Sequence, residues 1–215
     1  MAQKQKFRRT LNILEKSKKQ SQFDYTEVFR HIRTNIEFSN VDNPIKSIAI
    51  TSSQPGEAKS TTSMNLAFIF AAKYQKVLII DCDLRKTMLH KYMKLSNSYG
   101  LLYVLTAGIH VPNPSELLSS DTFKDYMKVL KQNFDFIIID CAPIGAISDA
   151  IPVGNAVDGT IFVVSAKDTK RKDAAQCVDL LKRSNVNVIG SVLTKADSGS
   201  GSYHYYYWWK RYPFL

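Results

Sequence analysis

Short apolar runs alternate with amphipathic stretches over most of this chain, from about residue 45 to residue 193. The apolar runs have the length of strands, and the stretches between them carry apolar residues at helical spacing. Strands that are apolar on both faces and are separated by helices indicate a parallel sheet covered on two sides. We therefore predict an α/β domain with a mostly parallel sheet and helices on both of its faces. The predicted strands are Ile45–Thr51, Val77–Asp81, Phe134–Asp140, Thr160–Ser165 and Val186–Leu193, and the predicted helices lie near residues 60–73, 115–132, 147–157 and 170–184.

The two ends of the chain depart from this pattern. Residues 1–25 are polar and basic, and residues 198–215 begin with a Ser/Gly linker and end in a run of aromatic residues. Between them, residues 26–197 are the predicted folded domain, which opens with a helix over Glu27–Phe38. A chain of 215 residues, 45% of them hydrophobic, is large enough for one such domain with its own core.

The net charge of +10 is concentrated near the start of the chain. Nine basic and three acidic residues precede position 34, so this segment carries +6 of the total. A basic arm suits an anionic membrane surface or nucleic acid, and a solvated leader is the alternative. Because no aromatic–basic platform accompanies the arm, no nucleic-acid partner is expected.

No membrane span or secretory signal is expected from the sequence. The longest apolar run, Leu66–Ala72, is far shorter than the ~18 residues that a span needs. The chain also does not open with a charged segment followed by an apolar one. We therefore expect a protein on the cytoplasmic side of the membrane.

A candidate phosphate-binding loop follows the first predicted strand. The segment Ser52–Thr61 joins that strand to a helix, which is the context that such a loop requires. Backbone amides and the positive end of the helix would hold the phosphates, Lys59 would neutralise them, and the Ser60 hydroxyl would bind Mg²⁺. Ser53 and Ala58 stand where the usual motif has glycine, so an ordinary strand–helix turn is the alternative. The candidate nucleotide-binding residues are Ser53, Gln54, Pro55, Gly56, Glu57, Ala58, Lys59, Ser60 and Thr61.

Acidic residues end two other predicted strands. Asp81 and Asp83 lie two residues apart after one strand, and Asp140 closes another. Ligands of open α/β sheets bind at the carboxyl ends of the strands, where a carboxylate can hold Mg²⁺ beside a phosphate. A lone aspartate after a strand is more often a helix cap or a turn residue. Three acids at two strand ends, with a Lys-Ser pair at a third, favour a site for a magnesium–nucleotide complex.

The motif Asp81-x-Asp83-x-Arg85 resembles the second acidic motif of the bacterial protein-tyrosine kinases, the autokinases of capsule and exopolysaccharide synthesis. The resemblance runs from about Glu27 to the C-terminus. It implies a P-loop NTPase-like fold, the cofactors ATP and Mg²⁺, and phosphorylation of the chain's own tyrosines. The other matching segments are Ser52–Ser60, Pro112–Leu118, Asp140-x-Ala-Pro143 and the tyrosine-rich end.

The resemblance also implies a role for each matching residue. The catalytic residues would be Asp81, Lys59 and Arg85, and the metal would be held by Ser60, Asp83 and Asp140. Lys59 would bind phosphate, and Asp81 would accept the proton of the incoming tyrosine hydroxyl. Arg85 would either stabilise charge on the transferred phosphate or hold its loop, and the sequence leaves both roles open.

The two ends of the chain also gain an interpretation from the resemblance. Five tyrosines fall within the last thirteen residues, where an autophosphorylated segment would lie, although this aromatic and basic stretch also suits a membrane interface. The residues of the motif Glu27-x-x-Arg30-x-x-Arg33 are three apart, which would place all three charges on one stripe of the helix. In the family this motif implies a ring-shaped homo-oligomer, with a solvated helix face as the alternative. The implied partners are a membrane-bound polysaccharide co-polymerase adaptor, which would place the kinase at the inner face of the cell membrane, and a cognate tyrosine phosphatase. The candidate phosphorylated residues are Tyr203, Tyr205, Tyr206, Tyr207 and Tyr212.

Two departures from the family pattern bear on activity. Ala58 replaces the glycine before Lys59, and a Cβ at a position that needs φ > 0 or lies close to phosphate would cost ~1–2 kcal/mol. Such a cost would weaken ATP binding roughly tenfold, and Ala58→Gly would restore it. The chain is also short between Gly100 and Pro112, which would expose sheet surface or loosen an edge.

Two other functions fit parts of the sequence. A partitioning-type ATPase with a deviant Walker motif shares the sheet and both acidic motifs, but that class carries an additional lysine where Gln54 stands here. A nucleotide-dependent scaffold with little phosphotransfer would result if Ala58 and the short region impair catalysis. The segment Thr194-Lys195-Ala196-Asp197 is similar to the guanine-reading motif of GTPases, with a strand-end turn as the alternative, and ATP is the expected nucleotide.

Overall fold

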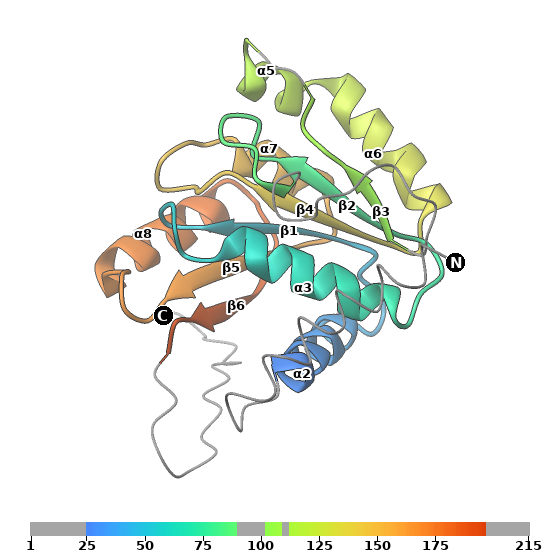
Figure 1. Ribbon diagram of the computed structural model, residues 1–215. Helices are drawn as coiled ribbons and strands as arrows, with labels where there is room; N and C mark the ends of the chain where they lie inside the picture. Colours follow the sequence, from blue (N-terminus) through green and yellow to red (C-terminus); the bar gives the residue numbers. More distant parts are fainter. Residues whose placement is uncertain (1–24, 90–101, 109–111, 197–215) are drawn as a thin grey trace.

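Six strands form one sheet with the order β3-β2-β4-β1-β5-β6 (Figure 1). The computed structural model describes residues 25–89, 102–108 and 112–196. All neighbouring strands of this sheet are parallel, as apolar strands separated by helices predict. The strands are β1 (Ser47–Ser52), β2 (Val77–Cys82), β3 (Leu102–Leu105), β4 (Phe136–Cys141), β5 (Gly159–Ser165) and β6 (Val188–Thr194).

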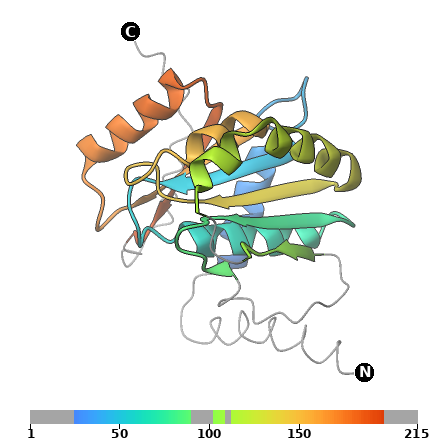
Figure 2. The same cartoon turned by 90° about the horizontal axis from the view of Figure 1, so that it is seen from above.

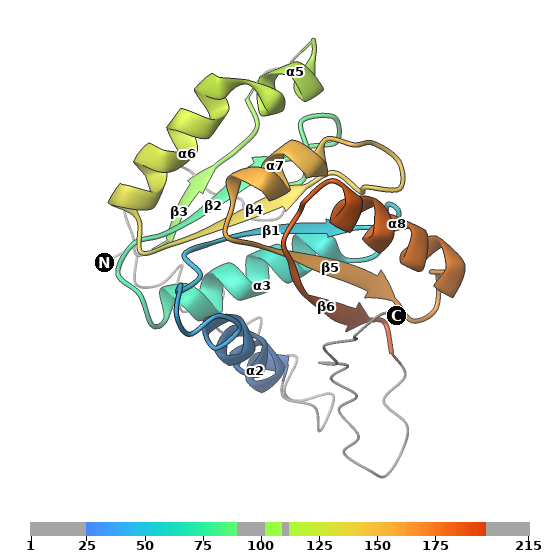
Figure 3. The same ribbon diagram turned by 180° about the vertical axis from the view of Figure 1, so that it is seen from behind.

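Helices cover both faces of the sheet, so the fold has three layers (Figure 2). Figure 1 shows the described helices of one face, and the view from behind shows those of the other face (Figure 3). This arrangement confirms the predicted fold class. The first face carries α2 (Tyr25–Glu37) and α3 (Lys59–Ala71), and the second carries α5 (Pro114–Ser119), α6 (Asp121–Asn133), α7 (Ala150–Ala156) and α8 (Arg171–Arg183).

The two cores follow from the alternation of side chains along each strand. In β2, Ile79 shares a core with Phe70 of α3, whereas Leu78 and Ile80 belong to the core on the other face. The rings of Phe70 and Phe136 stack with their centroids 3.7 Å apart, which packs α3 against β4. This contact holds the C-terminal end of α3 on the sheet, and the helix runs from there to its N-terminus at the carboxyl edge.

Two elements differ from the predicted ones. The edge strand β3 was not predicted, because its apolar run is only four residues long and was not assigned to the sheet. The helix predicted near residues 115–132 is two helices, α5 and α6, separated at Ser120. This residue has an extended backbone (φ −67°, ψ 152°), and its hydroxyl accepts a hydrogen bond from the Phe123 amide at 3.1 Å. Ser120 therefore starts a new helix as its N-cap.

The carboxyl ends of the central strands meet at one edge of the sheet. Asp81 of β2 and Asp140 of β4 are paired in register there, and the loop that follows β1 leads into α3 beside them. The predicted basic arm, apart from Tyr25, and residues 198–215 lie outside the described residues, so the domain boundaries at 26 and 197 stay predictions. None of the described helices combines the length and the apolar character that a membrane crossing requires.

Removal of the Ser120 hydroxyl tests the start of α6. We expect Ser120→Ala to lower the free energy of unfolding by about 1 kcal/mol, because the Phe123 amide loses its acceptor. Ser119→Ala changes an exposed serine next to it and should have an effect below about 0.5 kcal/mol. Urea unfolding measures both variants, and equal effects would contradict the cap.

Candidate active site

The loop between β1 and α3 has the geometry of a phosphate-binding loop. Gly56 (φ 89°) and Ala58 (φ 65°) both adopt left-handed backbone conformations, which curve the chain between strand and helix. Ala58 is the N-cap residue of α3, and no side chain of a described residue caps this helix. The first amides of α3 thus present the positive end of the helix dipole, which is what an anion needs.

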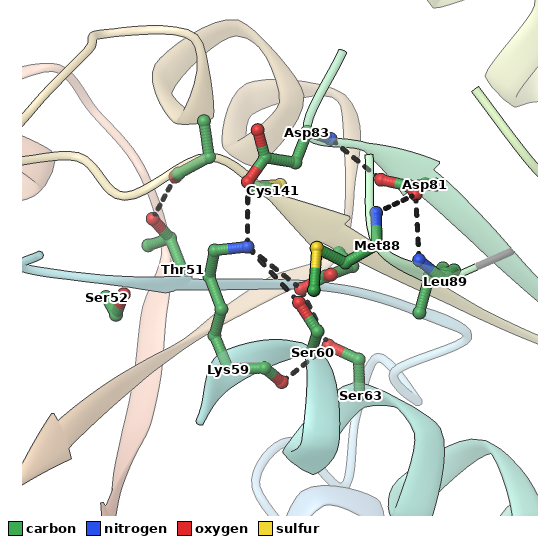
Figure 4. A network of polar contacts seen from close by, with 12 residues as sticks. Thr51, Ser52, Lys59, Ser60, Ser63, Asp81, Asp83, Met88, Leu89 and Cys141 are labelled. Carbon is green, nitrogen blue, oxygen red and sulfur yellow. Dashed lines mark hydrogen bonds and ion pairs between the residues drawn. The ribbon is translucent and has the colours of Figure 1, made fainter. Parts of the chain in front are cut away.

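Lys59 lies within ion-pair distance of two of the predicted acidic residues, and Figure 4 shows it beside Asp83. Its Nζ is 3.0 Å from Asp83 Oδ2 and 3.7 Å from Asp140 Oδ1. The same atom is 3.4 Å from the Ser60 hydroxyl. Burial lowers the pKa of Lys59, but the charges of Asp140 and Asp83 outweigh it and raise the pKa, so the ammonium stays charged. The structure thus brings together the lysine of the loop and acids from two other strand ends.

Asp140 is a fully buried acid in this group. Its Oδ1 accepts a hydrogen bond from the Ser63 hydroxyl at 3.1 Å, whereas Oδ2 has no hydrogen-bond partner among the described residues. Burial raises the pKa of Asp140 to about 6, against the opposing charge of Lys59. A buried carboxylate oxygen without a donor is unfavourable, and a bound cation would satisfy it.

A magnesium ion fits this donor set. The Ser60 hydroxyl and the carboxylates of Asp83 and Asp140 are hard oxygen ligands of the kind that Mg²⁺ prefers. Within the described part of the chain, no group of three or more His, Cys, Asp or Glu residues could hold a metal ion. An ion held by these three side chains would need phosphate oxygens and water to complete its coordination shell.

Asp81 is paired in register with Asp140 but makes different contacts. Its Oδ1 accepts a hydrogen bond from the Asp83 amide at 3.2 Å. Its Oδ2 accepts two more, from the amides of Met88 at 3.1 Å and Leu89 at 3.2 Å (Figure 4). Burial raises the pKa of Asp81 despite these bonds. The carboxylate thus also organises the loop after β2, a role that the sequence did not predict.

Arg85 is engaged with two other loops. Its Nε donates to Asp149 Oδ2 at 2.9 Å, and its Nη2 donates to the Ser115 hydroxyl at 3.2 Å. The Ser115 hydroxyl donates in turn to Oδ1 of the buried Asp149 at 2.5 Å. These side chains join the loop after β2 to the starts of α5 and α7. Of the two roles left open for Arg85, its contacts favour the one of holding the loop.

The predicted oligomerisation motif lies only partly at the surface. Glu27 and Arg30 form an exposed ion pair at 2.9 Å. The Arg33 side chain, by contrast, is 19% exposed, and its Nη1 donates to the carbonyl oxygen of Ile69 in α3 at 3.1 Å. Arg33 lies six residues after Glu27, so its side chain is rotated about 120° from that of Glu27 around the helix axis. This rotation places Arg33 on the side of α2 that faces α3. The expectation of one stripe for all three charges is therefore wrong for Arg33.

Two contacts near the site were not predicted from the sequence. Ser63 lies one helical turn after Lys59 on the same side of α3, a spacing that the sequence does show. Thr194, at the end of β6, donates to the carbonyl oxygen of Glu57 at 2.9 Å and ties that strand to the phosphate loop. No sequence signal announces this contact, because its two residues are 137 positions apart.

Comparison with known proteins finds relatives over most of the chain. Residues 48–206 match the family described as CbiA, the CobQ/CobB/MinD/ParA nucleotide binding domain. The chain is 39% identical over 203 residues to the tyrosine-protein kinase YwqD of Bacillus subtilis, which covers 84% of this chain and 86% of that protein. It is 32% identical over 208 residues to the tyrosine-protein kinase CpsD of Streptococcus pneumoniae, which covers 86% and 91%. The solved chimerical protein CapA2B2 is similar with a TM-score of 0.72 at 33% identity, over 78% of this chain and 83% of that one.

The buried charge of Asp140 should destabilise the nucleotide-free protein at neutral pH. Because its pKa is raised, the folded state binds more protons than the unfolded state between about pH 4 and about pH 6, and stability falls as the pH rises through this window. We expect Asp140→Asn to raise the free energy of unfolding by about 1–3 kcal/mol at pH 7 and to lose this advantage near pH 4.

Denaturant unfolding at the two pH values measures this difference. Asp125→Asn, which changes an exposed carboxylate of α6, is the matched control and should have little effect at either pH. An Asp140→Asn protein that is less stable than wild type at pH 7 would show that the carboxylate is stabilising.

Ala58→Gly tests the backbone strain before Lys59. A left-handed alanine costs about 1–2 kcal/mol, and the freer unfolded chain of glycine takes back about half of that, so the free energy of unfolding should rise by about 0.5–1 kcal/mol. Asn185→Gly after α8 is the matched control, because asparagine tolerates its left-handed conformation (φ 59°) and should gain less. Thermal unfolding compares the two variants, and no gain in stability at position 58 would refute the strain.

The roughly tenfold gain in ATP affinity that Ala58→Gly should bring is a separate prediction. It requires in addition that the Cβ of Ala58 lies close to a bound phosphate, and calorimetry would measure it.

Proposed function

This chain belongs to the bacterial tyrosine-protein kinases of capsule and exopolysaccharide systems, and we propose that it uses Mg-ATP to phosphorylate the tyrosine cluster of its own C-terminal segment. In this transfer a bond forms between the tyrosine oxygen and the γ-phosphorus. The bond from that phosphorus to the oxygen of the β-phosphate breaks, and ADP leaves. The proposed acceptors are Tyr203, Tyr205, Tyr206, Tyr207 and Tyr212.

The phosphate loop is the part of the site that would hold ATP. The amides at the start of α3 and the ammonium of Lys59 would bind the β- and γ-phosphates. Ser60, Asp83 and Asp140 would hold magnesium, which when bound neutralises charge that develops on the transferred group. The position of Lys59 between the two acids, beside the uncapped start of α3, is the observation that supports this proposal best.

Asp81 would accept the proton of the tyrosine hydroxyl. A phenol with a pKa of ~10 is mostly protonated at neutral pH, so an acceptor assists the transfer. Backbone amides take three of the roughly four lone-pair positions of this carboxylate, and the remaining one, on Oδ1, would receive the hydroxyl. The same amides fix the carboxylate in place, so alignment and charge neutralisation would supply most of the acceleration.

The partitioning-type ATPase is less well supported. The matched family description includes MinD and ParA, so the domain alone does not separate the two functions. Gln54, which stands in place of the additional lysine of that class, donates from its side chain to the carbonyl oxygen of Asp168 at 2.9 Å. Together with tyrosine kinases as relatives at 32% and 39% identity, this favours the kinase.

A membrane adaptor, a ring-shaped oligomer and a cognate tyrosine phosphatase complete the proposal. The chimerical nature of the related CapA2B2 protein supports an adaptor that is a separate protein. The exposed pair of Glu27 and Arg30 on α2 offers a charged surface for the ring, while Arg33 would act indirectly by fixing α2 on α3. Docking on the adaptor would hold the kinase at the inner face of the cell membrane.

Lys59→Met tests self-phosphorylation. Wild-type protein incubated with Mg-ATP should acquire phosphate on the tyrosines of residues 203–212, and Lys59→Met should lose this activity by about 100-fold or more, because the phosphates lose their buried cation. Lys76→Met, which changes an exposed lysine, is the matched control and should keep it. Tandem mass spectrometry of the C-terminal peptides locates and counts the phosphates.

Undiminished phosphorylation in Lys59→Met would contradict catalysis by this site. A wild-type protein that binds ATP but stays unphosphorylated, even with the cytoplasmic segment of its adaptor, would favour the nucleotide-dependent scaffold.

A further inference from the structure

Glu57 places an acid inside a loop that has to bind an anion. The residue is 1% exposed, although it lies only two positions before Lys59. A carboxylate there repels phosphates and competes with them for the positive end of α3. A charge that opposes the function of the loop needs a structural reason.

Three donors converge on this carboxylate. The Ser53 hydroxyl donates to Oε1 at 2.7 Å, and the Gln54 amide donates to Oε2 at 3.0 Å. The Thr169 hydroxyl also donates to Oε1. Because that hydroxyl accepts from the Ser165 amide at 3.1 Å, its own hydrogen is left for Glu57. Glu57 thus closes the loop on itself and fastens it to the segment after β5.

The hydrogen bonds keep the carboxylate ionised. Burial raises the pKa of Glu57, but the bonds from Thr169, Gln54 and Ser53 outweigh it and hold the pKa below its ordinary value. At neutral pH the three donors therefore meet an anion, and such bonds are roughly twice as strong as those between neutral groups.

Two further hydrogen bonds connect the loop to neighbouring segments. Thr194, the last residue of β6, donates to the carbonyl oxygen of Glu57 at 2.9 Å, and the Gln54 side chain donates to the carbonyl oxygen of Asp168 at 2.9 Å. Lys195 pairs with the Asp168 carboxylate at 2.5 Å, which joins the two anchoring segments to each other. The loop is thus fastened to the ends of β5 and β6.

We propose that Glu57 is a positioning residue of the ATP site: its carboxylate, anchored by Thr169, holds the phosphate loop in its binding shape. The inference rests on the proposed binding of ATP by this loop. Because Glu57 accepts the inward-pointing donors, the other loop amides and the start of α3 are left to face the phosphates. The loop is then formed before ATP arrives, and less conformational entropy is lost on binding, which offsets the repulsion between Glu57 and the phosphates.

Two substitutions test separately whether ATP binding depends on the shape of the loop or on the charge of Glu57. Glu57→Ala removes the acceptor and leaves buried donors unpaired. Glu57→Gln removes the charge but can keep the network, since its oxygen can accept from Gln54 and its amide group can donate to the hydroxyls of Ser53 and Thr169. In calorimetry with Mg²⁺, we expect Glu57→Ala to weaken ATP binding about tenfold or more and Glu57→Gln to bind within about threefold of wild type.

The anchor can be tested from the other side. Thr169→Val keeps the shape of the residue and removes the hydroxyl, so it should weaken ATP binding by about threefold to tenfold. Thr122→Val changes an exposed threonine of α6 and is the matched control, with unchanged affinity expected. Urea unfolding of each variant separates a local effect on the loop from a loss of the fold.

Wild-type affinity in Glu57→Ala, or equal losses in Glu57→Ala and Glu57→Gln, would overturn the inference. If the wild-type protein itself bound no ATP, the proposed function would fail, and hydrogen exchange without nucleotide would still decide the role of Glu57. The Gln54 amide, which donates to Glu57, should then exchange about tenfold faster in Glu57→Ala than in wild type or in Glu57→Gln. Equal exchange in all three proteins would overturn the inference in that case.

Discussion

The ammonium of Lys59 between the carboxylates of Asp83 and Asp140 is the interaction on which the rest of the site depends. Each group alone would be an uncompensated buried charge, which costs several kcal/mol in a protein interior. They can meet because Lys59 begins α3, Asp83 follows β2 and Asp140 lies near the end of β4. Parallel strands end at the same edge of the sheet, and α3 begins at that edge. The stacked rings of Phe70 and Phe136 hold the other end of α3 on the sheet. The fold therefore determines where the cation and the two anions come together.

The charges at this edge do not balance. Among the described residues, the buried charges around Lys59 include the three aspartates at positions 81, 83 and 140. Asp81 is compensated by backbone amides, but one oxygen of Asp140 receives no hydrogen bond from the part of the chain that the structure describes. A site optimised for stability would not keep this oxygen, whereas a site for a metal ion and a phosphate needs it. The imbalance thus supports the proposed metal and phosphate site over a purely structural ion pair.

Local sequence patterns were sufficient to predict those site residues that lie next to the end of a strand. Apolar strands followed by acids, and a Lys-Ser pair before a helix, are features of neighbouring residues, so the α/β fold and the acid–lysine cluster could be predicted. Contacts between loops could not, because Arg85 meets Asp149 64 positions away and Glu57 meets Thr169 112 positions away. The error at Arg33 has another cause. Spacing along a helix gives the angle between side chains, but only tertiary packing decides which of them a neighbouring helix covers.

Ala58 shows how the two sides of the phosphate loop act together. On one side, Glu57 is fastened to Thr169 and Thr194, and on the other, Lys59 is drawn toward the buried acids. A left-handed alanine would relax to a more favourable backbone if either neighbour could move. Because each neighbour is fixed by contacts made elsewhere in the fold, the strained conformation persists at φ 65°. The ion pairs of Lys59 on one side of Ala58 and the hydrogen bonds of Glu57 on the other thus keep the loop curved. They do so although alanine is less suited than glycine to this conformation.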